Sequence, residues 1–498
     1  MNQIFEKLQP YLEKEMAFST ALTLMDWDME TLAPKEAVDY TSKAVGVLSQ
    51  ERFSSIINPE VKKILEQLEG EKGLNCFECA VVKKLKKEYK KTEKISKEEM
   101  REFSELTSKA LHAWQKAKKA KDFSIYAPYL EKIIVFKKKF AEQGKEEGQT
   151  LYDVLLDDYE EEFDEKVLDE FFSKLKEKIV PLLKKIEKQE DIEDSFLFLD
   201  YDEEKQEEFN RWLAEYIGFC FDRGVIAQSE HPFTTALHNH DVRITTHYYK
   251  NNLASALLST IHEGGHALYE MGVDDEFTQS IVGGGASCGM HESQSRFFEN
   301  MIGRSVPFWK PIYGKLKEIF PKQLENVGLE KFVKALNKVK ADFIRTEADE
   351  LTYCLHIMVR YELEKQMINE EIDVKELPKL WNEKYKEYLG IEPKDDTEGI
   401  LQDIHWAMGS IGYFPSYALG NAFAAQIYHQ MKKDLPIEEL LEKEEISKIV
   451  DYLREHIHQY GASKDAREML KDLTKEEFNP DYYIAYLEEK FKGVYGID

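Results

Sequence analysis

Glycine and proline are scarce in this chain. Its 498 residues include 25 glycines and 14 prolines, below the roughly 7% and 5% that are usual in proteins. Because both residue types interrupt helices, their scarcity predicts long helices. The length exceeds that of a typical domain, so the chain can bury a large core.

Basic side chains are also in deficit. The 68 lysines and arginines face 95 aspartates and glutamates, which gives a formal net charge of −27. Such a field repels phosphate backbones and anionic lipids, so we expect no nucleic-acid partner. The sequence has no run of 18 apolar residues and no apolar signal-peptide segment at its start. We therefore expect no membrane partner either.

Five cysteines are too few to cross-link a chain of this length, and an odd number cannot all pair. Cys76 and Cys79 form a lone C-x-x-C pair, but the next cysteine is Cys220, so no second ligand pair is near. We favour unpaired thiols over a zinc knuckle or a redox site. The composition predicts a cytoplasmic protein in a reducing compartment.

The spacing of apolar residues changes along the chain. Over residues 1–188 they recur every three or four positions between lysine- and glutamate-rich faces, which is typical of amphipathic helices. Residues 195–249 contain short β-branched and aromatic stretches, which predict a small sheet. The helical pattern returns at Asn251. These patterns favour a mainly α fold with a small β-sheet.

No internal repeat or low-complexity linker interrupts the chain. We therefore expect a single domain, 1–498, made of a helical N-terminal part (1–190) and a catalytic part (191–498). Seven of the 13 histidines lie between His231 and His291. This concentration places the expected chemistry in the second part.

Residues 262–266 have the sequence His-Glu-Gly-Gly-His, inside a segment, 251–272, with helical apolar spacing. Because His262 and His266 lie one turn apart on one helical face, they can bind the same divalent ion. Glu263 then lies beside the ion, where it can take a proton from water.

Local signals support a helix around this motif. Asn251 or Asn252 can cap its start, and Gly272 can end it. Gly264 and Gly265 each cost about 1 kcal/mol relative to alanine inside a helix. We therefore expect another backbone or the substrate to approach this helix closely.

A catalytic zinc site needs a third protein ligand. A metzincin would have a histidine six residues after His266, but that position is Gly272. Glu270 is too far from His262, about 12 Å along the helix axis, for both to bind one ion. Glu292 on the next expected helix is the best candidate, and a surface-exposed Glu292 is the alternative.

Two further carboxylates are candidates for supporting roles. A ligating histidine usually donates its second ring proton to a carboxylate or carbonyl, and either Asp241 or Asp349 can serve here. Residues 331–368 are predicted to form one long helix with a polar stripe that includes Arg345 and Asp349. These two form either an exposed pair or a cleft wall in which Arg345 binds a substrate carboxylate.

Glycines and aromatic residues surround His405, Tyr413 and Tyr417. This composition fits a loop that closes on the substrate and donates hydrogen bonds to a developing oxyanion. Aromatic core packing is the alternative for each residue.

Six short motifs occur in order along the chain. They are His231-Pro232-Phe233, Asp241-x-Arg243-x-Thr245, His262-Glu263-x-x-His266, His291-Glu292-Ser293-Gln294, Ile344-Arg345-x-x-Ala348-Asp349 and Gly399-x-x-Gln402-Asp403-x-His405-Trp406. Together with Trp27-Asp28-x-x-Thr31-x-x-Pro34, this set resembles the thermostable metallocarboxypeptidases of the Taq carboxypeptidase type, which are gluzincins.

The resemblance implies a nearly all-helical, saddle-shaped body with a deep groove that residues 1–190 cover. It implies a homodimer that removes single residues, with broad specificity, from peptides with a free C-terminus. It also implies one zinc ion per chain, replaceable by cobalt, on His262, His266 and Glu292, with Glu263 as general base. Arg345 becomes the expected ligand of the terminal carboxylate. Five further candidates for the carboxylate pocket or the oxyanion are His231, Arg243, His405, Tyr413 and Tyr417.

Two other functions compete with this interpretation. The first is a metal-dependent oligopeptidase that cuts inside short peptides. The second is an inactive helical scaffold that binds peptides and keeps zinc for folding. An intact Glu263 argues against the scaffold, because a structural site would close with a fourth protein ligand instead.

Overall fold

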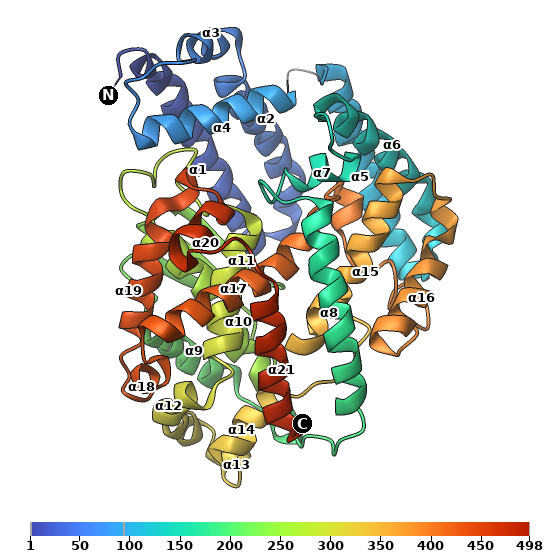
Figure 1. Cartoon of the computed structure of the whole chain (residues 1–498), viewed down its shortest axis with the longest axis vertical. Helices are drawn as coiled ribbons and strands as arrows, with labels where there is room; N and C mark the ends of the chain where they lie inside the picture. The colour runs from blue at the N-terminus through green and yellow to red at the C-terminus, as the bar shows by residue number, and fades with distance from the viewer. Residues whose placement is uncertain (1, 93–94, 498) are drawn as a thin grey trace.

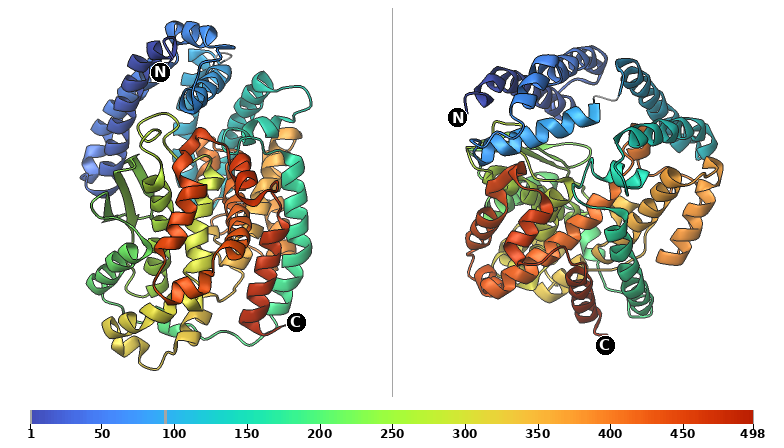
Figure 2. Two further views of the ribbon diagram at one scale, coloured as in Figure 1. Left: turned by 60° about the vertical axis from the view of Figure 1, so that its left-hand side comes forward. Right: turned by 45° about the horizontal axis from the view of Figure 1, so that its top comes forward.

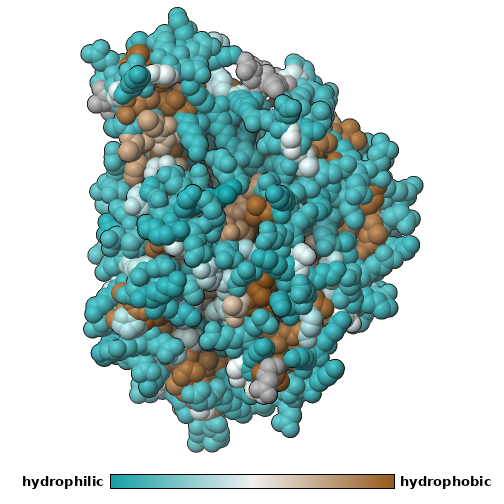
Figure 3. Space-filling model, in the orientation of Figure 1, coloured by the Kyte–Doolittle hydropathy of each residue, from teal (hydrophilic) through white to brown (hydrophobic). Residues whose placement is uncertain are grey.

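We describe the protein from a computed structural model, which covers residues 2–92 and 95–497. The fold is mainly α-helical with one small sheet (Figure 1), as the sequence predicts. In the part of the chain that the structure describes, no helix is long and apolar enough to cross a membrane. The face in Figure 3 is mainly hydrophilic, with apolar side chains in small separate groups.

The first part of the chain is helical throughout. Its α-helices are α1 (Gln9–Thr31), α2 (Val38–Ile56), α3 (Pro59–Gln67), α4 (Cys76–Thr92), α5 (Lys97–Ala120), α6 (Ala127–Gly144), α7 (Leu151–Leu156) and α8 (Glu165–Ile186). Within residues 2–92 and 95–188, the expected series of helices is therefore confirmed.

A small sheet and a long series of helices follow. They are α9 (Glu203–Ile217), β1 (Gly224–Gln228), β2 (Thr234–His238), β3 (Asp241–Thr246), α10 (Leu253–Gly272), α11 (Cys288–Arg296), α12 (Val306–Ile319), α13 (Pro321–Leu324), α14 (Leu329–Leu336), α15 (Glu350–Asn369), α16 (Leu377–Leu389), α17 (Phe414–Asp434), α18 (Ile437–Glu442), α19 (Ser447–His456), α20 (Ala466–Thr474) and α21 (Asp481–Tyr495). A π-helical turn, Phe297–Ile302, extends α11.

The sheet has the strand order β1-β3-β2, with β1 parallel and β2 antiparallel to β3. Strand β2 is therefore an edge strand, and it contacts both α10 and α1. Figure 2 shows the sheet below α1 and beside the C-terminal helices. The predicted strand content of residues 195–249 is only partly right. Residues 195–198 form a 3₁₀ turn, and α9 occupies much of the remainder.

Three hydrophobic clusters lie among the described residues, and the two largest divide the molecule. Residues 2–92, which we call the N-terminal cap, enclose a small core that extends from Phe5 to Leu85 in sequence and also includes Val282. Helices α5 to α8 instead share the large core with the C-terminal helices. Figures 1 and 2 show the cap as a separate group of helices at one end.

Helix α10 begins and packs as its sequence suggests. The Asn252 side chain caps its start by accepting a hydrogen bond from the backbone of Ser255. A Cβ atom on Gly265 would lie only 2.6 Å from the backbone oxygen of Gln294 in α11. A Cβ on Gly264 would lie 2.4 Å from Ile217. The two glycines therefore let α11 and α9 approach α10 closely, so the expected close approach is confirmed.

The single helix predicted over residues 331–368 is wrong. Helix α14 ends at Leu336, a 3₁₀ turn covers Arg345–Glu347, and α15 begins at Glu350. The break follows from Asp349, whose side chain accepts hydrogen bonds from the first backbone N–H groups of α15. An N-cap residue has non-helical backbone angles, so the helix starts there. Arg345 consequently lies in an irregular segment rather than on a helix face.

Candidate metal centre

Three side chains from two adjacent helices converge on one point. His262 and His266 come from α10, and Glu292 comes from α11. Their ligand atoms all lie within 4.8 Å of one another. Glu292 Oε2 is 3.7 Å from His262 Nε2 and 3.4 Å from His266 Nε2. We call these three residues the metal-ligand cluster, since two imidazoles and a carboxylate are a zinc-type donor set.

The second nitrogen of each histidine has its own partner. His262 Nδ1 lies 2.9 Å from Glu299 Oε2, and His266 Nδ1 lies 2.5 Å from His291 Nδ1. His291 Nε2 in turn lies 2.7 Å from Glu270 Oε1. These contacts orient both rings so that their Nε2 atoms face Glu292.

The two aspartates expected in this supporting role make other contacts. Asp241 accepts two hydrogen bonds from Arg243, at 2.8 and 2.7 Å, and Asp349 caps α15. The sequence interpretation missed Glu299 and His291 as ring partners. The sequence did contain a signal for Glu299. The helix that carries Glu292 continues, and a residue two turns later, such as Glu299, lies on the same face.

Buried charges around the metal-ligand cluster fix its protonation. Burial lowers the pKa of His266 to about 3, so its ring is neutral and offers a lone pair. Burial also lowers the pKa of His262, but the carboxylates of Glu292 and Glu299 more than offset this and raise it. Burial alone would raise the pKa of Glu292, yet Arg296 and the histidines hold it well below its usual range.

Two guanidinium groups contact the carboxylates of the cluster and its support. Arg296 donates to Glu292 at 2.7 Å and to Glu299 at 3.0 Å. Arg304 donates to Glu299 at 2.9 Å. With Glu263 included, the site contains three carboxylates and two guanidiniums, which is an excess of one negative charge. Such an excess in a low-dielectric site attracts a cation.

Glu263 lies next to the first ligand and is 6% exposed. Its carboxylate accepts a hydrogen bond of 2.6 Å from the hydroxyl of Thr234 in β2. Burial is the main cause that raises its pKa above the ordinary value. The edge strand thus orients a buried carboxylate beside the metal-ligand cluster, a role for Thr234 that the sequence did not indicate.

The cluster opens into a cleft of about 600 Å³. One wall carries Glu263 and the ligands, and another carries Tyr413 and Tyr417. Helix α4 of the N-terminal cap contributes Lys84 and Glu88 to the same cleft. The cap therefore forms part of the candidate site.

A second group of buried charges lies nearby, and we call Arg345, Arg360 and Asp403 the arginine cluster. Arg345 is 7% exposed, and its Nε and Nη2 atoms lie 3.0 and 2.9 Å from Asp403 Oδ1. The Nη2 of Arg360 lies 2.6 Å from the other oxygen of Asp403. Arg345 also donates to the Tyr353 hydroxyl at 3.2 Å. Two guanidiniums therefore share one carboxylate, and Asp349 does not hold Arg345 as expected.

Three other predicted residues gather around Arg345. Its guanidinium lies 4.9 Å from the ring centroid of Tyr417, whose hydroxyl is 3.3 Å from His405 Nε2. The ring centroid of Tyr413 is 5.1 Å from that of Tyr417. Burial lowers the pKa of His405 to about 4, so this histidine adds no positive charge near neutrality. The two tyrosines connect the arginine cluster to the metal cleft.

His231 and Arg243 lie in a different place. Arg243 stacks over Trp27 at 5.6 Å, and His231 lines a small cleft with Trp27 and Phe233. Phe233 also lines the metal cleft. The structure therefore brings these two residues to a neighbouring wall and not to Arg345.

Comparisons with known proteins agree with this geometry. A family model described as carboxypeptidase Taq (M32) metallopeptidase matches residues 7–491. Carboxypeptidase 1 of Bacillus subtilis is 43% identical, with 97% of each chain covered. Thermostable carboxypeptidase 1 of Pyrococcus furiosus is 40% identical, over 98% of this chain and 99% of the relative. The crystal structure of an M32 carboxypeptidase from Deinococcus radiodurans matches with a TM-score of 0.97 at 32% identity, and the match covers 100% of both chains.

Proposed function

The chain belongs to the carboxypeptidase Taq (M32) metallopeptidase family and is a metallocarboxypeptidase; from this premise we propose which residues carry out the reaction and how. The enzyme releases single amino acids, with broad specificity, from the free C-terminus of peptides. The observation that carries the proposal is a pair of neighbouring buried clusters with opposite excess charge. One attracts a divalent cation and the other a carboxylate.

His262, His266 and Glu292 hold the metal, one ion per chain. Their donor set supports zinc, since catalytic zinc sites use three nitrogen or oxygen ligands and keep a position open. Cobalt should substitute, because it accepts the same ligands. When bound, zinc polarises the scissile carbonyl and lowers the pKa of water toward neutrality.

Glu263 acts as general base and then as general acid. Its carboxylate takes a proton from the attacking water and delivers it to the leaving amine. Burial supports this role because it raises the pKa of Glu263, and a base works best with a pKa near the working pH. Thr234 holds the carboxylate in place through its 2.6 Å hydrogen bond.

Arg345 binds the terminal carboxylate of the peptide. The arginine cluster has two guanidiniums for one aspartate, so a substrate carboxylate would neutralise its excess charge. An internal peptide segment would leave that charge unpaired, which favours exopeptidase action. Tyr413, Tyr417 and His405 complete this pocket and supply donors for the carboxylate or the oxyanion. His231 and Arg243 contact the substrate from the neighbouring wall.

A time course on a short N-blocked peptide, followed by mass spectrometry, tests the proposal. Metal-stripped, zinc-restored and cobalt-restored enzyme are compared with a Glu263→Gln variant. Stepwise loss of single C-terminal residues that requires both metal and Glu263 is the expected result. Internal cuts would replace the proposal with an oligopeptidase, and no cleavage by zinc-loaded enzyme would replace it with a peptide-binding scaffold.

Three broader features complete the proposal. The whole chain acts as one metallocarboxypeptidase domain, in which residues 1–190 cover the groove and 191–498 carry the catalytic residues. Lys84 and Glu88 in the metal cleft support the covering role. The enzyme is a homodimer, which sedimentation analysis would test. It works in the cytoplasm, as the five free cysteines suggest.

A further inference from the structure

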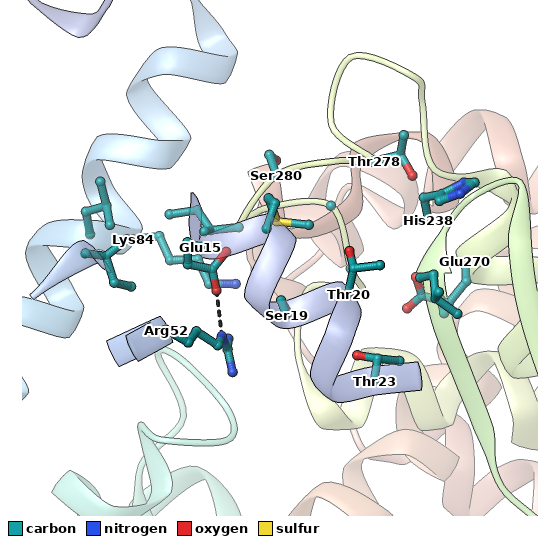
Figure 4. Close-up of a pocket in the computed structure, with 18 of the residues that line it drawn as sticks. Glu15, Ser19, Thr20, Thr23, Arg52, Lys84, His238, Glu270, Thr278 and Ser280 are labelled. Atoms are coloured by element: carbon teal, nitrogen blue, oxygen red, sulfur yellow. Dashed lines mark hydrogen bonds and ion pairs between the residues drawn. The ribbon is translucent and has the colours of Figure 1, made fainter. Parts of the chain in front are cut away.

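A second pocket, of about 360 Å³, lies between the N-terminal cap and the catalytic part. Figure 4 shows α1 along one wall and His238 and Glu270 across from it. Lys84 and Glu88 of α4 line both this pocket and the metal cleft. The two hollows are therefore neighbours that share a wall, and we call the second one the cap pocket.

Glu15 of α1 is the most deeply buried charge in the cap pocket, at 2% exposed. One of its oxygens, Oε1, accepts a hydrogen bond of 2.8 Å from Arg52 (Figure 4). The other oxygen, Oε2, is buried without any hydrogen-bond partner among the described residues. A buried acceptor left unpaired is unfavourable, so this oxygen is available for a donor on a ligand.

The shared wall carries two more charged groups, Lys84 and Glu88, which act on each other by charge but not through a hydrogen bond. Neither the Lys84 ammonium nor the Glu88 carboxylate forms a hydrogen bond or an ion pair with the residues that the structure describes. Burial lowers the pKa of Lys84, which indicates that its ammonium is poorly hydrated. Lys84 therefore suits a carbonyl oxygen of a ligand, and Glu88 suits a cationic group.

The cap pocket lies at the far end of the metal motif from Arg345. At the His262 end of the motif, Glu299 contacts both His262 and Arg296. Arg296 lies 4.4 Å from the ring of Tyr353, and Tyr353 accepts a hydrogen bond from Arg345. At the other end, Glu270 lines the cap pocket two helical turns, about 12 Å, from His262. A peptide held at Arg345 by its C-terminus therefore extends from the metal toward the cap pocket.

Strand β2 gives the scale of that extension. Thr234 contacts Glu263 at the metal-ligand cluster, and the residues 236–238 line the cap pocket. A separation of two to four strand residues is about 7–13 Å. An extended substrate beside β2 reaches the pocket with the third to fifth residue before the scissile bond.

We propose that the cap pocket is a subsite for a positively charged group of the peptide, which Glu15 Oε2 and Glu88 bind while Lys84 donates to a peptide carbonyl. The proposal rests on the proposed function, because it assumes a peptide anchored at Arg345. The same chemistry has two sources: the free α-ammonium of a short peptide, or a lysine or arginine side chain of a longer one. Charge favours the assignment, since Glu15, Glu88 and Glu270 outnumber Arg52 and Lys84 in the lining.

Two peptide series distinguish the sources with the zinc-loaded enzyme. In acetylated hexapeptides, lysine is compared with norleucine at the third, fourth and fifth residue before the scissile bond. In neutral peptides of four to six residues, a free amino terminus is compared with an acetylated one. We expect the matching cation to raise kcat/KM about tenfold, mainly through KM, as a charge-assisted hydrogen bond would.

Glu15→Gln and Glu88→Gln should each reduce this preference to less than about twofold. Glu13→Gln is the matched control, because it removes the same charge from an exposed position on α1. The half-buried Glu88 makes no hydrogen bond through its carboxylate to the described residues and acts on Lys84 by charge alone, so its variant tests the subsite even where Glu15→Gln disturbs the pairing with Arg52.

An acetylated dipeptide is too short to reach the cap pocket, so Glu15→Gln and the Glu13→Gln control should hydrolyse it as fast as the wild type does. Failure to cleave this dipeptide at all would count against the proposed function and not against the subsite. A preference in either peptide series supports the subsite and identifies its source. Equal rates for cationic and neutral peptides, or a preference that persists in both glutamine variants, would overturn it.

Discussion

The metal-ligand cluster and the arginine cluster both combine buried carboxylates with guanidiniums, but their excess charges have opposite signs. Around His262 and His266, the carboxylates exceed the guanidiniums by one. In the arginine cluster, two guanidiniums share Asp403 alone. Burial lowers the pKa of His266 in the first place and of His405 in the second, whereas Glu292 and Glu299 raise the pKa of His262. With two guanidiniums in each place, a difference of two carboxylates therefore decides whether a buried site attracts a cation or a carboxylate.

The two clusters also lie close together, and under the proposed function this placement accounts for exopeptidase action. Arg296 donates a hydrogen bond to Glu292 of the metal-ligand cluster and stacks on the ring of Tyr353. The Tyr353 hydroxyl accepts a hydrogen bond from Arg345. Tyr413 and Tyr417 connect Arg345 to the metal cleft. A carboxylate fixed at one cluster therefore places the nearest peptide bond at the other. The comparison teaches that selectivity for a chain end arises from two charge excesses at a fixed separation.

Replacing Asp403 with asparagine should have the largest effect. It would leave Arg345 and Arg360 buried without a counter-charge, and losing one partner of a buried pair costs about 3–5 kcal/mol of unfolding free energy. Urea denaturation near neutral pH measures this loss. Asp472→Asn is the control, because Asp472 forms an exposed pair with Lys464 and should change stability little. An equal loss of unfolding free energy in the two variants would contradict the inference that Asp403 is the shared counter-charge of Arg345 and Arg360.

Arg345→Ala should damage activity more than stability. Arg360 and Asp403 would remain as a balanced pair, so we expect the fold to survive. Loss of a buried partner for the substrate carboxylate should lower kcat/KM by about 100-fold or more, in line with 2–5 kcal/mol for such pairs. Metal content should not change. The discriminating measurement compares peptide acids with peptide amides, and the variant should lose most of the wild-type preference for acids.

Glu364 sharpens the comparison because it is a buried carboxylate one helical turn after Arg360 whose hydrogen-bond donors are neutral, while Lys137 acts on it by charge alone. It accepts hydrogen bonds from Tyr152, Trp406 and the backbone of Gly412. Burial raises its pKa from 4.5 to about 7. The unfolded chain ionises first, so this group favours the fold below about pH 4.5 and loses that contribution as pH rises toward 7.

Glu364→Gln should remove this pH dependence. Between about pH 4.5 and 7, the unfolding free energy of the wild type should fall relative to the variant by at most about 3 kcal/mol. Urea titrations at several pH values measure the difference, in which all other titrating groups cancel. A difference that is constant with pH would mean that Glu364 is ionised in the fold, as Asp403 is.

Local patterns predicted the parts of the site that depend on neighbouring residues. Apolar spacing and Asn252 were sufficient to place His262 and His266 on one helix, because capping and periodicity act over a few residues. The pairing of Arg345 with Asp403 was not predictable in this way. The two residues lie 58 positions apart, Arg345 in a three-residue 3₁₀ turn and Asp403 in a loop. No periodic pattern relates such positions.

The position of the N-terminal cap shows the same limit. The helices of residues 2–92 were predictable from amphipathic spacing, but the placement of Glu15 opposite Glu270 was not (Figure 4). Contacts between distant segments depend on how whole elements pack, and this information is spread over all the hydrophobic clusters. Asp349 was a different case, since an aspartate before a new apolar period is a recognisable helix start.

Glu299→Gln should have the smallest effect of these variants on function, because it changes the support of a ligand and not a ligand itself; its loss of the pairs with Arg296 and Arg304 affects stability separately. The glutamine can still accept a hydrogen bond from His262 Nδ1, but it no longer stabilises the charge that develops on the ring. Such supporting contacts are worth about 10- to 100-fold in metal affinity. Competition with a chelator measures the affinity for zinc. Glu270→Gln is the matched comparison, since Glu270 acts on His266 only through His291, and it should weaken zinc binding less. A larger loss of zinc affinity in Glu270→Gln would contradict this ranking. It would show that the contacts from Glu270 through His291 to His266 matter more for zinc binding than the carboxylate beside His262.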